Sequence, residues 1–409
     1  MPIQKERLWA RLQALGEIGA TPEDGVTRLA YTPAYRRAET LVRAWMEEAG
    51  LQTRLDAVGN LIGRREGAQA GRGCVMLASH IDTVINGGRY DGALGVLSAI
   101  ETVQAMDEDG VFLDAPLEVV AFMDEEGTRW QGGLFGSRAM VAPPSAEDLQ
   151  RQDAEGVTMA AAMEAWGLDL ARLHEAVRRP DEIEAYLELH IEQGAVLESQ
   201  GLAAGVVTGI AGLLLLGLEL NGSADHAGAT PMGPLRRDAM LGAAELALCA
   251  EAIAREVSST CVATVGQLEL SPGVFNIIPG QASMTFDLRD ITEAARDEAE
   301  ARLRQAIEDV AAKRGLRWEL TELLRAAPVP LSPRVIQAVA AACQQSDVPD
   351  FRLPSGAGHD AQVMTQLTDV GMIFVRCRGG VSHSPDETVT PEDAWLGAKV
   401  MYESVLQLR

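Results

Sequence analysis

Five of the six histidines in this 409-residue chain stand beside acidic, glycine or serine residues where an apolar run ends. The sixth, His174 in LARLHEAVRR, lies in a helical pattern and is expected at the surface. One histidine at the end of a strand is usually structural. Five such placements with carboxylates beside them indicate a metal site or acid–base chemistry.

His80 and Asp82 stand two residues apart in the sequence His80-Ile81-Asp82. In an extended backbone their side chains point to the same side. His80 can then bind a metal, while Asp82 fixes an imidazole from behind or supports a catalytic base. Asp91 follows the turn at 86–88 and precedes a helical pattern. It could simply cap that helix, but we favour a carboxylate that bridges two metals.

Three consecutive acids, Asp124, Glu125 and Glu126, follow another apolar run. In a solvated turn they would be unremarkable. At the mouth of a sheet, crowded carboxylates repel one another unless a cation lies among them. Metalloamidase chemistry needs one acid on the metal and a second one free as general base. Glu126 and Glu125 suit these two roles.

Two more imidazoles, His190 in LHIEQG and His383 in VSHSP, complete a candidate ligand set. The set is His80, Asp91, Glu126, His190 and His383. Two metals that share one carboxylate, with a water between them, need about that number of ligands. Nitrogen and oxygen donors without thiolate suit Zn²⁺, Mn²⁺, Co²⁺ or Ni²⁺. We therefore expect two divalent metal ions per subunit.

Short apolar runs alternate with helical patterns in the first half of the chain, which is typical of an α/β sheet. Strands are expected at the start of 73–84, 117–130 and 184–201, and a helix over 91–106. The polar clusters all follow such strands. Open α/β sheets gather their sites at the carboxyl ends of strands, so the candidate residues should meet there.

The pattern changes near residue 211 and changes back near residue 325. Between these points the expected order is β-α-β-β-α-β, with long helices in RRDAMLGAAELALCAEAIAREV and ITEAARDEAEARLRQAIEDVAAKRG. This is the split-βαβ order, four antiparallel strands under two helices. We predict a catalytic metal-binding domain of residues 1–210 and 326–409, interrupted by an inserted domain of residues 211–325.

Composition narrows the class of protein. The net charge of −24 argues against a nucleic-acid partner. No run of eighteen apolar residues is present, which argues against a membrane-spanning helix. The N-terminal segment MPIQKERLWARLQALG lacks the features of a secretory signal, and the five cysteines are scattered without a CxxC pair. We expect a cytoplasmic protein.

The chain resembles the two-metal aminoacylase and carboxypeptidase superfamily of metallopeptidases. Within it, the chain is similar to the amidase/hydantoinase/carbamoylase branch, which includes N-carbamoyl-L-amino-acid hydrolases, allantoate amidohydrolases and β-ureidopropionases. The resemblance covers essentially the whole chain. It is carried by GVTRLAYTP (25–33), SHIDTVINGGRYDGALGVL (79–97), DEEGTRW (124–130), GSRAM (136–140), ELHIEQGAVLE (188–198), DHAGATPM (225–232), FNIIPG (275–280), DLRD (287–290), SGAGHDA (355–361) and MIFVRCRGGVSHSP (372–385).

The resemblance implies an α/β catalytic domain with a mixed sheet and two metals, and an inserted α+β ferredoxin-like domain that acts as lid and dimerisation domain. It makes the five residues named above the metal ligands, with Asp91 bridging. It makes Glu125 the general base and Asp82 its supporting acid. His226 would act in catalysis, reaching in from the partner subunit of a homodimer. The implied substrate-binding residues are His226, Asn276, Arg289, Gln193, Gly356 and Ala357.

Arg289 also has a simpler interpretation, a surface salt bridge with Asp287 or Asp290. A guanidinium is equally a bidentate clamp for a substrate carboxylate, and it supplies local positive charge in an acidic protein.

The expected activity is hydrolysis of the ureido C–N bond of N-carbamoyl-L-amino acids. The aliphatic run at 212–216 favours these small-molecule substrates, whereas SHIDTVINGG and SGAGHDAQ are more similar to allantoate amidohydrolases. Trp130 and Cys377 replace the more usual Phe and Ser. Hydrolysis of other N-acyl amino acids or peptides is a further alternative. A non-catalytic binding protein is disfavoured because all five ligands and Glu125 are present.

Overall fold

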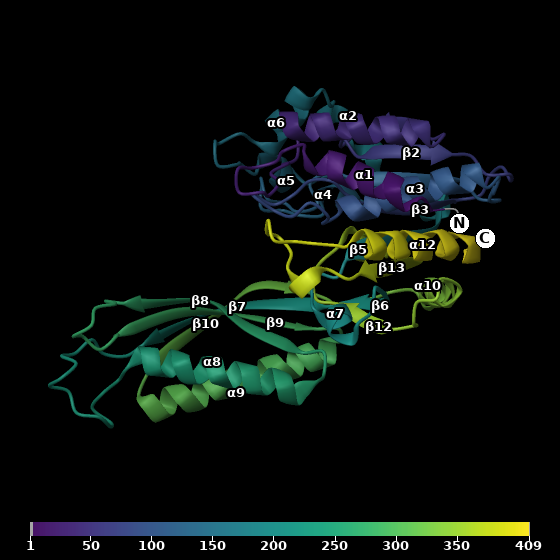
Figure 1. Ribbon diagram of the computed structural model, residues 1–409. Helices are drawn as coiled ribbons and strands as arrows, with labels where there is room; N and C mark the ends of the chain where they lie inside the picture. Colours follow the sequence, from purple (N-terminus) through teal and green to yellow (C-terminus); the bar gives the residue numbers. More distant parts are fainter. Residues whose placement is uncertain (1–2, 409) are drawn as a thin grey trace. The chain divides into compact units, whose positions relative to one another are not determined.

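The computed structural model describes residues 3–408, which form two compact units (Figure 1). The large unit runs to Thr208 and resumes at Leu331–Leu353 and again from Gly358 onward. The inserted unit consists of Gly209–Pro330 and Pro354–Ala357.

A nine-stranded sheet has the order β1-β2-β4-β3-β5-β13-β6-β11, with β12 beside β6. At its centre β3 (Cys74–His80) is parallel to β4 (Leu117–Phe122) and to β5 (Ile183–Ile191), and β5 is parallel to β13 (Val370–Val375). These strands are almost entirely buried, as expected for parallel strands that are covered on both faces.

The outer strands make the sheet mixed. β2 is antiparallel to β4, and β6 is antiparallel to β13. The mixed sheet predicted for the catalytic domain is confirmed. The outer strands are β1 (Gln52–Leu55), β2 (Leu61–Arg65), β6 (Ala204–Ile210), β11 (Val329–Pro330) and β12 (Arg352–Ser355).

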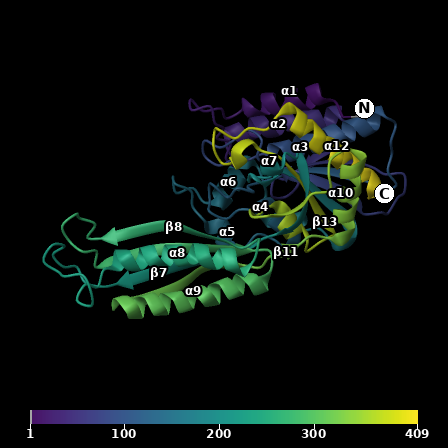
Figure 2. The same ribbon diagram turned by 60° about the horizontal axis from the view of Figure 1, so that its bottom comes forward.

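Long helices cover the sheet. α3 (Ala93–Glu108) and α12 (Pro391–Gln407) pack on β5 and on each other, and α12 also contacts α10 (Pro333–Gln345), as Figure 2 shows. α3 is apolar on nearly every side, which is why it is buried almost all round. α1 (Lys5–Gly16) packs on α3, and α2 (Pro33–Glu48) packs on β1 and β2.

Shorter helices complete the large unit. The sequence patterns did not predict α4, α5 or α6, because each is too short to show a helical period. They are α4 (Phe135–Val141), α5 (Ala146–Gln150), α6 (Met159–Trp166), α7 (Val196–Gln200), α11 (Asp360–Met364) and the 3-10 helices η1 (Leu170–Ala176), η2 (Pro180–Glu182) and η3 (Arg378–Gly380).

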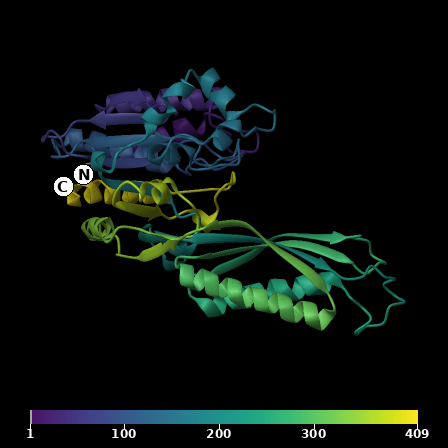
Figure 3. The same cartoon turned by 180° about the vertical axis from the view of Figure 1, so that it is seen from behind.

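The inserted unit contains a four-stranded antiparallel sheet in the order β10-β7-β9-β8. Alternate leucines of β7 are buried beneath two helices, α8 and α9, which lie side by side along one face in Figure 3. The predicted β-α-β-β-α-β order is confirmed. Its elements are β7 (Gly212–Asn221), α8 (Ala239–Val257), β8 (Val262–Ser271), β9 (Gln281–Asp290), α9 (Glu293–Arg314) and β10 (Arg317–Ala326).

Among residues 3–408, no helix combines the length and the apolar character needed to cross a membrane. All five cysteines fall in this range and carry free thiols.

Candidate metal centre and active site

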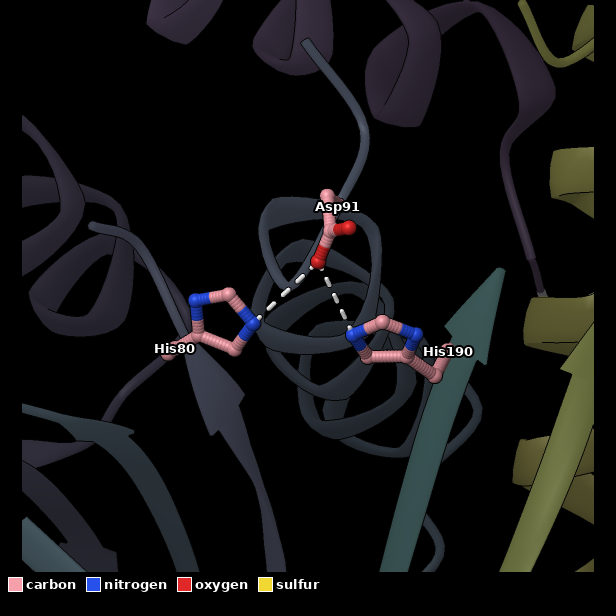
Figure 4. A group of neighbouring side chains, drawn as sticks. All are labelled: His80, Asp91 and His190. Atoms are coloured by element: carbon pink, nitrogen blue, oxygen red, sulfur yellow. Dashed lines mark ion pairs between the residues drawn. The ribbon is translucent and has the colours of Figure 1, made fainter. Parts of the chain in front are cut away.

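Two imidazoles and a carboxylate meet at the carboxyl end of the central strands. His80 ends β3 and His190 lies near the end of β5. Because β3 and β5 are neighbouring parallel strands, these two ends meet at the same edge of the sheet. Oδ1 of Asp91 lies 3.3 Å from Nε2 of His80 and 3.1 Å from Nε2 of His190. Figure 4 shows both rings directed at this one oxygen, and all three side chains are buried.

Asp91 does not cap α3. The helix begins at Ala93, and its N-cap is Gly92, which has φ 61°. A side chain at Gly92 would be strained by this left-handed conformation, and its Cβ would lie 2.4 Å from the His80 ring. The helix-cap interpretation of Asp91 is therefore wrong, and the carboxylate is free to face the two imidazoles.

The second oxygen of Asp91 faces another pair of groups. Nε2 of His383 lies 3.5 Å from Asp91 Oδ2 and 3.4 Å from Glu126 Oε2. Asp91 thus presents Oδ1 to His80 and His190, and Oδ2 to His383. A carboxylate arranged in this way can bridge two cations.

The side chain of Asp82 binds the backbone of the acidic loop at residues 124–126. Its Oδ1 and Oδ2 accept hydrogen bonds from the backbone N–H groups of Glu125 (3.3 Å) and Glu126 (3.1 Å). Its backbone carbonyl lies 3.2 Å from His80 Nδ1. The sequence left open whether Asp82 orients an imidazole or the catalytic base. In the structure Asp82 contacts both groups.

The acids in this region are short of counter-charge. Burial raises the pKa of Glu125 well above its usual range, and the nearby charges of Asp360, Glu126 and Asp82 add to that rise. Burial, followed by the charge of Asp91, raises the pKa of Glu126 to about 7. Such a cluster fits a cation, because a cation favours the charged form of every acid around it.

The pKa of Asp91 shifts in the opposite direction. Burial by itself would raise it, but His190, His383 and His80 hold the pKa of this carboxyl well below its usual range. The surrounding imidazoles therefore outweigh burial at Asp91 and favour its charged form, whereas at Glu125 and Glu126 burial prevails over the opposing charge of His80.

The donor atoms also have suitable spacing for metals. The ligand atoms of His80, Asp91 and His190 lie within 4.8 Å of one another, and so do those of Asp91, Glu126 and His383. These two groups share only Asp91. Nitrogen and oxygen donors in this arrangement fit two divalent cations with one bridging carboxylate.

Gln193 lies beside the ligands. Its Nε2 donates to Asp91 Oδ2 at 2.7 Å and lies 3.4 Å from His383 Nε2. Its Oε1 is buried without a hydrogen-bond partner among the described residues. Gln193 was predicted to bind substrate, and this free oxygen is an acceptor suited to that role.

Glu188 is a supporting residue that the sequence analysis missed. It accepts hydrogen bonds from Tyr186 Oη (2.8 Å), Ser79 Oγ (3.2 Å) and the Ala361 backbone (3.0 Å). It stands two residues before His190 on β5, a spacing that could have identified it. A carboxylate oxygen of Glu188 and one ring nitrogen each of His190 and His359 also lie within 4.8 Å of one another. Because its oxygens already accept these three hydrogen bonds, we interpret Glu188 as a residue that holds the neighbouring strand and not as a metal ligand.

In the inserted unit, His226 and Asn276 lie together. His226 forms a β-bridge with Ile277, and the carbonyl of Asn276 accepts a hydrogen bond from Ala227 N at 3.0 Å. Nδ1 of His226 accepts from the backbone N–H groups of Gly228 and Ala229, both at 3.1 Å. In the neutral ring the proton is then on Nε2, which makes Nε2 a hydrogen-bond donor.

The contacts of Arg289 fit both a surface salt bridge and a clamp for a substrate carboxylate. Its Nε and Nη2 donate to the two oxygens of Asp287 at 2.9 and 2.8 Å, as in a surface salt bridge. Its Nη1 donates to the carbonyl of Gly356 at 2.7 Å, next to Ala357. A guanidinium has five N–H groups, so about two remain for a ligand.

His174 lies on the 3-10 helix η1 and is exposed, apart from the other candidate residues.

Comparison with known proteins shows the family of this chain. The model of peptidase family M20/M25/M40 matches residues 76–407. The chain is 49% identical over 406 residues to an N-carbamoyl-L-amino acid amidohydrolase of Geobacillus stearothermophilus, with 99% of each chain covered. It is 37% identical over 426 residues to an allantoate deiminase of Arabidopsis thaliana, covering 96% of this chain and 80% of that one.

Among solved structures, an amidase of the hydantoinase/carbamoylase family from Burkholderia multivorans is similar, with a TM-score of 0.93 and 35% identity. The alignment covers 99% of this chain and 98% of the Burkholderia multivorans chain. The family match extends over most of the chain, and the relatives align with it nearly end to end. The chain belongs to peptidase family M20/M25/M40.

Proposed function

We propose that this chain hydrolyses the ureido C–N bond of N-carbamoyl-L-amino acids, releasing the L-amino acid, ammonia and carbon dioxide. The observation that carries the proposal is the 49% identity, over 99% of both chains, to a relative named for this activity. The grouping of five donor side chains beside Glu125 supports it.

We propose further that the centre takes two divalent cations, Zn²⁺, Mn²⁺, Co²⁺ or Ni²⁺. One would be held by His80, Asp91 and His190, and the other by Asp91, Glu126 and His383. Divalent cations at these ligands supply a Lewis acid that polarises the substrate carbonyl and lowers the pKa of water.

Glu125 is the proposed general base. One oxygen of its carboxylate takes a proton from the attacking water as the new oxygen–carbon bond forms at the ureido carbonyl. Glu125 then gives this proton to the amino acid nitrogen as the C–N bond breaks. The carbamate that is left decomposes to ammonia and carbon dioxide. Asp82 keeps Glu125 in place through the hydrogen bond to its backbone.

The proposed substrate contacts use the residues that the resemblance implies. Nε2 of His226 and the side-chain amide of Asn276 donate hydrogen bonds to the oxygen that becomes negative. The free N–H groups of Arg289 bind the substrate carboxylate, next to the backbone of Gly356 and Ala357. Oε1 of Gln193 accepts from the ureido nitrogen.

A homodimer with the inserted unit as lid and dimerisation domain stays a prediction, as does the cytoplasmic location. Support for the dimer comes from β8, which is an edge strand. Val262 on β8 is 51% exposed and Leu248 on the neighbouring helix α8 is 69% exposed. An unpaired strand edge beside exposed apolar side chains is suited to pairing with a second copy.

Ammonia release tests the proposed activity. Protein stripped of metal and reconstituted with Mn²⁺ is offered N-carbamoyl-L-methionine, its D-enantiomer and allantoate separately. Faster turnover of the L-carbamoyl compound is expected. Preference for allantoate would favour the second candidate function, which the likeness to the Arabidopsis thaliana deiminase supports. No ammonia release from any of the three compounds by metal-loaded protein would overturn the proposed substrate class.

A further inference from the structure

Glu387 is a buried glutamate in the loop between His383 and α12, and the mechanism above gives it no part. Only 3% of its surface is exposed. Its Oε1 accepts hydrogen bonds from the backbone N–H groups of Tyr90 at 2.8 Å and Asp91 at 3.0 Å. These bonds join segments of the chain that are almost 300 residues apart.

The second oxygen of Glu387 contacts the loop that carries His383. Oγ of Ser382 lies 3.0 Å from Glu387 Oε2 and 2.8 Å from Asp91 Oδ2. The two oxygens of Glu387 therefore reach the backbone at Asp91 and the side chain that precedes His383.

Gly88 leaves the space for this carboxylate. A Cβ at Gly88 would lie 2.0 to 2.3 Å from the carboxylate atoms of Glu387, and no other atoms come as close. Gly88 is not one of the glycines with positive φ. Its missing side chain therefore matters here for space and not for backbone conformation.

The loop around His383 needs outside support. His383 has φ 55°, a left-handed conformation that residues other than glycine seldom adopt and that persists only where the surroundings fix it. Its imidazole is half exposed, so packing alone does not hold it. Hydrogen bonds from backbone N–H groups to a carboxylate are among the stronger ones, and Glu387 makes two of them.

We propose that Glu387 is a positioning residue of the metal centre. It holds the backbone of Asp91 and the Ser382–His383 segment at a fixed separation, so that Asp91 Oδ2 and His383 Nε2 face the same cation. The inference rests on the proposed metal centre but not on its substrate.

Metal affinity tests this role without any assay of activity. Each protein is dialysed against graded Mn²⁺–chelator buffers, and its bound metal is measured by mass spectrometry. Glu387→Ala should weaken binding at one of the two sites by about 10- to 100-fold, the usual cost of losing such support. Glu387→Gln keeps an acceptor oxygen for both backbone N–H groups, so it should restore most of the affinity.

Glu118→Ala is the matched control. Glu118 is equally buried, at 2% exposed, and pairs with Arg64 and Arg178 away from the metal ligands. This variant should unfold more easily and keep the metal affinity of the wild type. An equal loss of affinity in Glu118→Ala would assign the effect of Glu387→Ala to general destabilisation and overturn the proposal.

Gly88→Ala tests the same contact without changing the acid. Its Cβ should displace the carboxylate and weaken metal binding, and it should cost nothing more when Glu387 is already alanine. Wild-type affinity in Glu387→Ala, or a full Gly88→Ala effect without Glu387, would overturn the inference. Failure of the wild type to bind any metal would instead overturn the proposed centre itself, and the inference with it.

Discussion

Oδ2 of Asp82 accepts a hydrogen bond from the backbone N–H of Glu126 at 3.1 Å. Its other oxygen does the same for Glu125, at 3.3 Å. One buried carboxylate thus supports the proposed base and a proposed ligand from the same side. Asp82 thus fixes the backbone of both acids, together with the hydrogen bond that Leu134 N donates to the carbonyl of Glu125 at 2.7 Å.

Replacing Asp82 with asparagine should slow the reaction. An amide can accept one of the two backbone N–H groups but opposes the other with its own N–H. We expect kcat to fall by about 10- to 100-fold, as for other supporting residues of metal sites. Measured at saturating Mn²⁺, a kcat equal to that of the wild type would show that the anchor is dispensable.

Glu125→Gln and Glu126→Gln should separate base from ligand. Glu125→Gln loses the proton acceptor, so kcat should fall by about 100- to 10,000-fold while two metals stay bound. Glu126→Gln loses a donor to one cation, so bound metal itself should decrease. Metal analysis beside ammonia release distinguishes the two. The reverse pattern would mean that the two roles are exchanged.

His226→Ala should reduce turnover without changing metal content. Removal of one donor to a developing oxyanion typically costs about 100- to 1,000-fold in kcat. His174→Ala is the control, because that exposed histidine lies on the 3-10 helix η1. Equal activity of the two variants would remove His226 from the reaction.

A mixture of two inactive variants should regain activity if His226 acts across a homodimer. In a heterodimer of His226→Ala with Glu125→Gln, one of the two sites has both residues intact. Random reassociation gives about half heterodimers, so about a quarter of wild-type activity is expected. The assay is ammonia release after dissociation and remixing. No recovery, with heterodimers verified by native mass spectrometry, would place His226 in its own subunit's site.

Glu118 should stabilise the protein in a pH-dependent way. Burial alone would raise the pKa of Glu118, but Arg178 and Arg64 lower it below its ordinary value of 4.5. A lowered folded-state pKa means that this stabilisation is present above pH 4.5 and is lost as the pH falls through the folded-state value. Glu118→Gln leaves the partly buried Arg178 with Glu182 as its remaining acidic partner, at 2.6 Å, and should cost about 2 kcal/mol near neutral pH.

Urea unfolding of wild type and Glu118→Gln across a pH series measures this difference in the free energy of unfolding. The difference in the free energy of unfolding should narrow as the pH falls below 4.5 and through the lowered folded-state pKa of Glu118. A gap that is constant with pH would show that the ion pairs do not lower the pKa of Glu118.

The sequence predicted those helices and strands in which a regular hydrophobic pattern extends over many residues. The helices α8 and α9 and the alternating strand β7 are examples, because burial of one face repeats regularly along them. The start of α3 was placed at Asp91 and lies at Ala93, because Gly92 in a left-handed conformation separates the acid from the helix.

The candidate ligands could be named from sequence because each follows an apolar strand or a glycine-rich turn. Glu387 could not be found in this way. It lies in a loop with no period, and its role comes from contacts with Tyr90 and Asp91, almost 300 residues earlier. Nothing in the local sequence indicates which distant backbone a loop glutamate will reach.

β13 follows the inserted unit in the chain and lies next to β5, the strand that carries His190. During synthesis, Asp91, Glu125 and Glu126 therefore leave the ribosome long before β13 and His383. The inserted unit, whose strands and helices contact one another locally, can fold in the interval. The nascent chain thus carries a cluster of acids that lacks the imidazole of His383 until late in translation. Of the two proposed metal sites, the one that uses His383 can therefore be completed only after the C-terminal segment has been translated.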